Sequence, residues 1–94
     1  MITKTKSGTT TRIRGISRNI VGSSPIGTLF KSRNLALKVQ SVIGERDLYY
    51  FYESYRTRPH VSKGETQVEW EMKSLELAGV VKRIMPKIWE KINE

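Results

Sequence analysis

The sequence contains no cysteine and a single histidine, and it has no apolar run of the roughly 20 residues that a membrane-spanning helix needs. The missing cysteine excludes a disulfide framework, a thiolate zinc site and a cysteine nucleophile. A single histidine excludes two-histidine metal motifs and most zinc sites. The polar N-terminus also lacks the apolar segment of a secretory signal. We therefore expect a soluble cytoplasmic protein with no cofactor, no bound metal and no membrane partner.

Acidic residues are missing from the first 44 positions. The net charge of +8 belongs entirely to this stretch, because residues 45–94 hold equal numbers of acidic and basic residues. Cations without neighbouring carboxylates are available to an external polyanion, of which nucleic acid is the commonest, although a basic protein with a merely solvated face has the same composition. The predicted phosphate contacts from this stretch are Lys4, Lys6, Arg12, Arg14, Arg18, Lys31, Arg33 and Lys38.

A chain of 94 residues is long enough for one hydrophobic core and too short for two. Residues 1–11 are polar and have little to bury, so they predict a flexible basic arm ahead of a single domain at residues 12–94. For that domain we predict the α+β class. It would have a small antiparallel sheet of three or four strands, with a C-terminal helix packed on one face.

The segment after the arm fits two structures. Residues 11–21 predict a half-buried strand with an arginine-bearing face, and the same isoleucine spacing fits an amphipathic helix, against which only Gly15 argues. Ser24 and Pro25 then suit the N-cap and first position of a short helix that ends by Arg33.

Three β-strands are predicted in the middle of the chain. Residues 35–43 alternate apolar and polar side chains, and residues 48–56 are rich in the aromatic residues that favour strands, so the two segments predict a hairpin. Residues 66–73 alternate strictly and predict a third antiparallel strand.

The last segment predicts a helix from Ser74 to the C-terminus, kinked at Pro86, where the ring removes a backbone donor. Exposed edges of a small sheet, or the kinked helix, would offer a surface for a homodimer. The expected core residues are Leu37, Val39, Val68, Trp70, Met72, Leu77, Val81, Ile84 and Ile88.

The predicted aromatic strand is a candidate stacking platform. Tyr49 and Phe51 would lie on one face near Arg56 and Arg58, and rings beside cations bind single-stranded nucleic acid without reading its sequence. The alternative is that these rings pack the sheet from inside.

A second candidate site consists of Glu69, Glu71 and Lys73 on one face of the third strand, with Asp47 upstream. Two carboxylates that hold a divalent cation, with a lysine near the attacking water, suit metal-assisted phosphodiester hydrolysis. Asp47 and the run Glu71-Met72-Lys73 resemble the acid-x-lysine core of restriction-endonuclease-like nucleases and resolvases, over about 27 residues. The resemblance implies a small metal-dependent nuclease.

His60 lies in a predicted loop beside Arg58, where it suits the role of acid or base in a ribonuclease. Three functions follow from these patterns. The first is non-enzymatic binding of DNA or RNA through the basic half. The second is a protein-binding inhibitor or regulatory module, with the character of small basic proteins of viruses and mobile elements, that acts on a larger macromolecular machine. The third is a small nuclease that uses Glu71 with Lys73, or His60.

Overall fold

The computed structural model describes the backbone of residues 2–55 and 57–94, and the side chains of this range except residues 2–7, 46 and 55. The described part contains four helices, a three-stranded antiparallel sheet of order β1-β5-β4 and a small β2-β3 hairpin. The predicted α+β class is therefore confirmed, and the last helix packs against the sheet. The elements are α1 (Ile2–Gly22), β1 (Leu29–Lys31), α2 (Ser32–Val42), α3 (Glu45–Tyr52), β2 (Ser54–Tyr55), β3 (Arg58–Ser62), α4 (Lys63–Leu77), β4 (Val81–Met85) and β5 (Ile88–Lys91).

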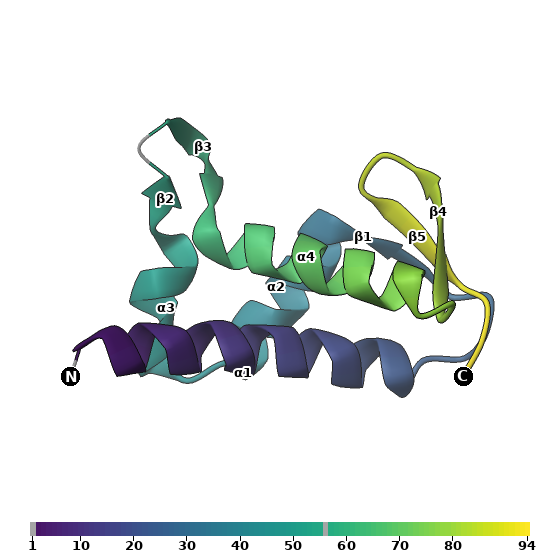
Figure 1. Cartoon of the computed structure of the whole chain (residues 1–94), viewed down its shortest axis with the longest axis horizontal. Helices are drawn as coiled ribbons and strands as arrows, with labels where there is room; N and C mark the ends of the chain where they lie inside the picture. Colours follow the sequence, from purple (N-terminus) through teal and green to yellow (C-terminus); the bar gives the residue numbers. More distant parts are fainter. Residues whose placement is uncertain (1, 56) are drawn as a thin grey trace.

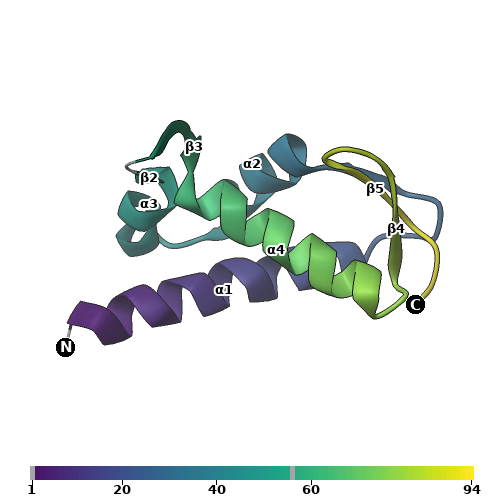
Figure 2. The same ribbon diagram turned by 45° about the horizontal axis from the view of Figure 1, so that its top comes forward.

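The molecule is elongated, with extents of 39 × 25 × 22 Å. Figure 1 shows α1 along its length with α4 beside it, the three-stranded sheet at one end and the β2-β3 hairpin at the other. Figure 2 shows α2 between β3 and the turn that joins β4 to β5. No helix in the described part of the chain is long and apolar enough to cross a membrane.

Helix α1 replaces the strand predicted for residues 11–21, which is wrong, and the helical alternative is correct. Ile13, Ser17 and Val21 recur every fourth residue and are fully buried, which gives one face that packs on α4. Gly15 has open space where a Cβ would stand, so its cost is only the weak helix propensity of glycine. Residues 2–11 form the first turns of this helix, and their predicted flexibility stays a prediction.

The hairpin predicted for residues 35–43 and 48–56 is also wrong, because these residues form α2 and α3. Leu35 and Val39 of α2 are buried one turn apart, as are Asp47 and Phe51 of α3. Burial of these helical faces outweighs the strand preference of the aromatic residues. The expected short helix at residues 24–33 is a turn with Gly27 at φ 97°, followed by β1.

Residues 66–73, predicted as a strand, belong to α4. The Ser62 hydroxyl accepts a hydrogen bond from the Glu65 amide at 3.1 Å and so caps the first turn. Gly79 ends the helix with φ 80°, which lets the Val80 amide donate to the Leu75 carbonyl at 2.9 Å. The buried residues of α4 follow helical spacing and are Gly64, Gln67, Val68, Glu71, Met72 and Leu75.

The kinked helix predicted from Ser74 onwards is wrong beyond Leu77, because the chain forms the β4-β5 hairpin there. Pro86 and Lys87 form its two-residue turn, and Lys87 has φ 66°, a left-handed conformation that usually favours glycine. Four expected core residues are buried, namely Val39, Val68, Met72 and Val81. Leu37, Trp70, Leu77 and Ile84 are exposed instead, and Ile88 is half-buried.

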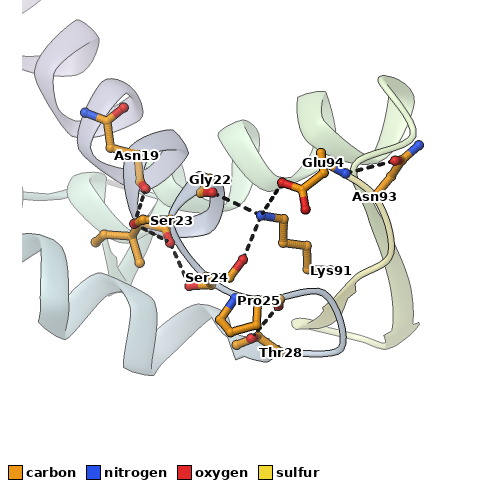
Figure 3. Close-up of polar contacts among 10 residues, drawn as sticks. Asn19, Gly22, Ser23, Ser24, Pro25, Thr28, Lys91, Asn93 and Glu94 are labelled. Carbon is orange, nitrogen blue, oxygen red and sulfur yellow. Dashed lines mark hydrogen bonds and ion pairs between the residues drawn. The ribbon is translucent and has the colours of Figure 1, made fainter.

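Lys91 joins the end of α1 to the sheet, as Figure 3 shows. Its side chain is 1% exposed, and its Nζ donates to the carbonyl oxygens of Gly22 at 3.1 Å and Ser24 at 2.7 Å. A cation is favourable at the C-terminus of a helix, where the last carbonyl groups lack helical partners. This basic residue therefore stabilises the fold and is not accessible to a ligand.

Candidate nucleic-acid interface

The predicted phosphate contact Arg12 is bound to Asp47 of α3. Its Nε donates to Oδ2 at 2.8 Å and its Nη2 donates to Oδ1 at 2.7 Å, while the Thr9 hydroxyl donates to the same carboxylate at 2.6 Å. The hydrogen bond that Arg12 donates to Asp47 raises the pKa of Arg12 above its ordinary value. Arg12 therefore stays protonated throughout the neutral range, and its pairing with Asp47 fastens α1 to α3.

Arg14 and Arg18 share a single carboxylate, Glu71 of α4. The Arg14 Nε donates to Oε1 at 3.0 Å and the Arg18 Nε donates to Oε2 at 2.9 Å, and Arg14 also donates to the Ser74 hydroxyl at 3.0 Å. The Glu71 side chain is 3% exposed, and its hydrogen bond raises the pKa of Arg18. Two buried carboxylates thus hold three arginines that sequence analysis assigned to phosphate.

The same contacts change the interpretation of the predicted nuclease site. Asp47 and Glu71 each bind their own arginines, and Glu69, Glu71 and Lys73 stand on a helix, where residues two apart do not share a face. Among the described residues, no three potential ligands of the His, Cys, Asp or Glu types lie close enough to hold a metal ion. The strand geometry on which this site depended is therefore wrong.

The aromatic candidates separate as well. Phe51 is fully buried against α4, where a Cβ on Gly64 would stand 2.3 Å from its ring. It has no face for a nucleobase, and its predicted stacking role is wrong. Tyr49 is 88% exposed and keeps its ring accessible. The predicted side-chain contacts of Lys4, Lys6 and Arg56 lie outside the described side chains.

The remaining predicted cations gather beside α2. A groove of about 660 Å³ opens there, lined by residues of α2, β3 and the β4-β5 turn. Its floor includes the apolar side chains of Leu37 and Ile88. Among the described residues that line it, Glu65 is the one carboxylate, whereas the basic lining residues are Lys31, Arg33, His60 and Lys87.

A smaller hollow of about 360 Å³ continues this groove, since Lys31 and Leu37 line both, and it adds Lys38. Lys31, Arg33 and Lys38 are exposed, and within the described residues no carboxylate lies within 4.0 Å of their charged nitrogens. Arg58 is exposed on β3, two residues before His60 and hence on the same side of that strand. We call this surface the α2 groove.

Sequence analysis missed Lys87 and Ser32, both of which line the α2 groove. The Pro86-Lys87 pair carried a signal, because proline favours the second position of a turn, although the helical spacing around it was followed instead. The Lys87 amine lies 3.7 Å from the Glu69 carboxylate. No family model, curated protein or solved structure matches this chain.

Proposed function

We propose that this chain is a small, non-enzymatic nucleic-acid-binding protein whose phosphate contacts come from the α2 groove. The single observation that supports this is the separation of the cations. Arg12, Arg14 and Arg18 of α1 are held by buried carboxylates, whereas Lys31, Arg33 and Lys38 are exposed and have no acidic partner among the described residues. Unpaired cations that line a groove and its adjoining hollow lower the electrostatic energy of a polyanion there.

Arg33 and Lys38 lie on different sides of α2. Five residues are about 7.5 Å along a helix and about 140° around it, so Arg33 lines the groove while Lys38 lines the adjoining hollow. The apolar floor at Leu37 and Ile88 offers a contact for sugars or bases between the phosphates. Lys31 and Lys87 also line the groove, and Arg58 is exposed on β3, the strand that carries the lining residue His60. We expect DNA or RNA to bind, in the cytoplasm.

A binding titration tests the proposal. Nuclease-treated protein is titrated against labelled single- and double-stranded DNA and RNA, and binding is followed by fluorescence anisotropy. We expect Arg33→Gln with Lys38→Gln to weaken binding at least about tenfold, roughly 0.7 kcal/mol for each lost phosphate contact. The matched control, Lys73→Gln with Lys82→Gln, removes the same charge from exposed positions that do not line the groove. Equal losses in the two variants would contradict a localised site.

The same titration, carried out with magnesium present, also tests for enzymatic activity. The oligonucleotides are afterwards run on a denaturing gel, which shows whether they were cut. The proposal expects intact strands. Cut product that disappears in His60→Ala would assign a ribonuclease to the groove, and cut product abolished by EDTA would assign a metal-dependent activity.

A protein partner is the second candidate function, and the exposed face of α4 favours it. Trp70 is 49% exposed and Leu77 is 91% exposed, and seven residues place them on one side of the helix, two turns apart. A regulatory or inhibitory module predicts a stable protein complex that survives nuclease treatment. Leu77→Asp would abolish this complex and leave oligonucleotide affinity unchanged.

A further inference from the structure

The N-terminus of α2 opens onto the α2 groove without a cap. Lys31 occupies the N-cap position and makes no side-chain capping hydrogen bond, and the first turn carries no acidic residue. The Ser32 amide donates to the Lys87 carbonyl at 3.0 Å. The next two amides, those of Arg33 and Asn34, have no acceptor within the helix, because they belong to its first turn. These amides and the helix dipole give this end a partial positive charge.

A second observation at the same place concerns the Ser32 side chain. Ser32 is 1% exposed and lines the groove. Within the described residues its hydroxyl makes no hydrogen bond, whereas Ser17 and Ser24, elsewhere in the fold, each donate to a backbone carbonyl. This hydroxyl is therefore free to donate a hydrogen bond to an acceptor that enters the groove.

Three cations line the same groove as this hydroxyl. Lys31 and Arg33 flank Ser32 in the chain, and Lys87 reaches the same groove from the β4-β5 turn. Lys87 is held there by the Pro86 turn and by the backbone hydrogen bond with Ser32. Glu65 is the one carboxylate among the described lining residues, and Glu69 lies 3.7 Å from the Lys87 amine, so Lys31 and Arg33 supply the positive charge that no described carboxylate pairs.

We propose that the N-terminus of α2, with Ser32, Lys31, Arg33 and Lys87, is a phosphate-binding site. Backbone amides, a hydroxyl and a guanidinium group are the donors that bind phosphate oxygens at helix N-termini. The identity of the bound phosphate rests on the proposed function. If the protein binds nucleic acid, the phosphate is an internal phosphodiester or a terminal phosphomonoester of the bound strand. A terminal phosphomonoester carries more negative charge and more free oxygen atoms than an internal phosphodiester. The two sources should therefore bind differently, and the test compares them.

The site is tested with inorganic phosphate and the full chain by amide-resolved NMR, with chloride at equal ionic strength as the reference. We expect saturable shifts of the Arg33 and Asn34 amides. Ser32→Ala should weaken phosphate binding about fivefold, the equivalent of one neutral hydrogen bond. Lys87→Asn should weaken it about tenfold, because asparagine tolerates the left-handed backbone and removes only the charge. Lys82→Asn, in β4, is the control and should leave binding unchanged.

The two sources are distinguished with one oligonucleotide that is prepared with and without a 5′-phosphate. Tighter binding of the phosphorylated strand, lost in Ser32→Ala, assigns the site to strand ends. Equal binding of both strands, weakened equally by Ser32→Ala, assigns it to internal phosphodiesters. The absence of phosphate-dependent shifts in α2 overturns the site, even where oligonucleotides still bind elsewhere on the protein. Shifts in α2 without any oligonucleotide binding keep the site and overturn the proposed function.

Discussion

Three arginines of α1 and the basic residues Lys31 and Arg33 at the start of α2 come from the same acid-free stretch of sequence and have opposite surroundings. Arg12, Arg14 and Arg18 form ion pairs with carboxylates that lie 35 to 57 residues further along the chain. Lys31 and Arg33 remain exposed on the rim of a groove. Basic residues in an acid-free stretch of sequence can therefore still pair with carboxylates that the fold brings from elsewhere in the chain.

The difference lies in the carboxylates. A buried carboxylate is costly without a partner, so Asp47 and Glu71 require cations, and α1 packs directly over both helices that carry them. Helix α2 also packs on α4, yet the residues it turns inward are Ser32, Leu35 and Val39, and its cations point away. Position on the helix thus separates cations that stabilise the fold from cations that are free to bind.

The largest expected effect on the α1 side of this comparison comes from Gly64→Ala. The new methyl group would stand 2.3 Å from the Phe51 ring, so α3, which carries Asp47, must move away from α4. Overpacking of this kind typically costs about 1–3 kcal/mol, and we expect about 2–3 kcal/mol here from urea unfolding. Gly15→Ala, with open space around it, is the control and should be neutral or stabilising. An unchanged Gly64→Ala protein would contradict the packing of α3 on α4.

A moderate effect is expected for Glu71→Gln, which removes the charge that Arg14 and Arg18 share. We expect a loss of about 1–2 kcal/mol, since the buried group loses charge-assisted hydrogen bonds while the arginines still reach water. Oligonucleotide affinity should stay equal or rise, because two arginines are released. Glu76→Gln on the exposed side of α4 is the control. A fall in affinity without a fall in stability would place Glu71 in the binding site.

The smallest effect is expected for Lys87→Gly, which sharpens the comparison from the α2 side. Glycine relieves the left-handed backbone strain at φ 66° but has more freedom in the unfolded chain, which leaves a gain of about 0.5–1 kcal/mol in stability. The affinity for labelled oligonucleotides should fall, because a cation that lines the groove is lost. Thermal unfolding and an anisotropy titration on the same sample measure both quantities. A stabilised variant with full affinity would remove Lys87 from the interface.

The fold class and the cations were predictable from the sequence, whereas most element positions were not. In α4 the alternation of Val68, Trp70 and Met72 hid a helical face, because two of its inward positions are the polar residues Gln67 and Glu71. The burial of Glu71 depends on its ion pairs with Arg14 and Arg18 of α1. Local signals did exist: the Ser62 cap with Glu65 three residues later, and Gly79 at the helix end.

The binding surface was predictable only in part, for the same reason. Lys31, Arg33 and Lys38 were among the predicted contacts, but so were the three α1 arginines, and no local pattern distinguishes the two groups. Only the tertiary contacts of Asp47 and Glu71 do so. Lys87 and Ser32 join the groove through the pairing of β1 with β5, which is a long-range contact.

The most direct test of the central claim, that the α2 groove rather than α1 binds the polyanion, is the salt dependence of duplex DNA binding. Five phosphate contacts from Lys31, Arg33, Lys38, Arg58 and Lys87 predict a slope of log K against log salt of about −4.5. Replacement of Lys31, Arg33 and Lys38 by glutamine should reduce it to about −1.8. The control, with Lys73, Lys82 and Arg83 replaced by glutamine, should keep the original slope. A slope unchanged by the first triple replacement would contradict the account.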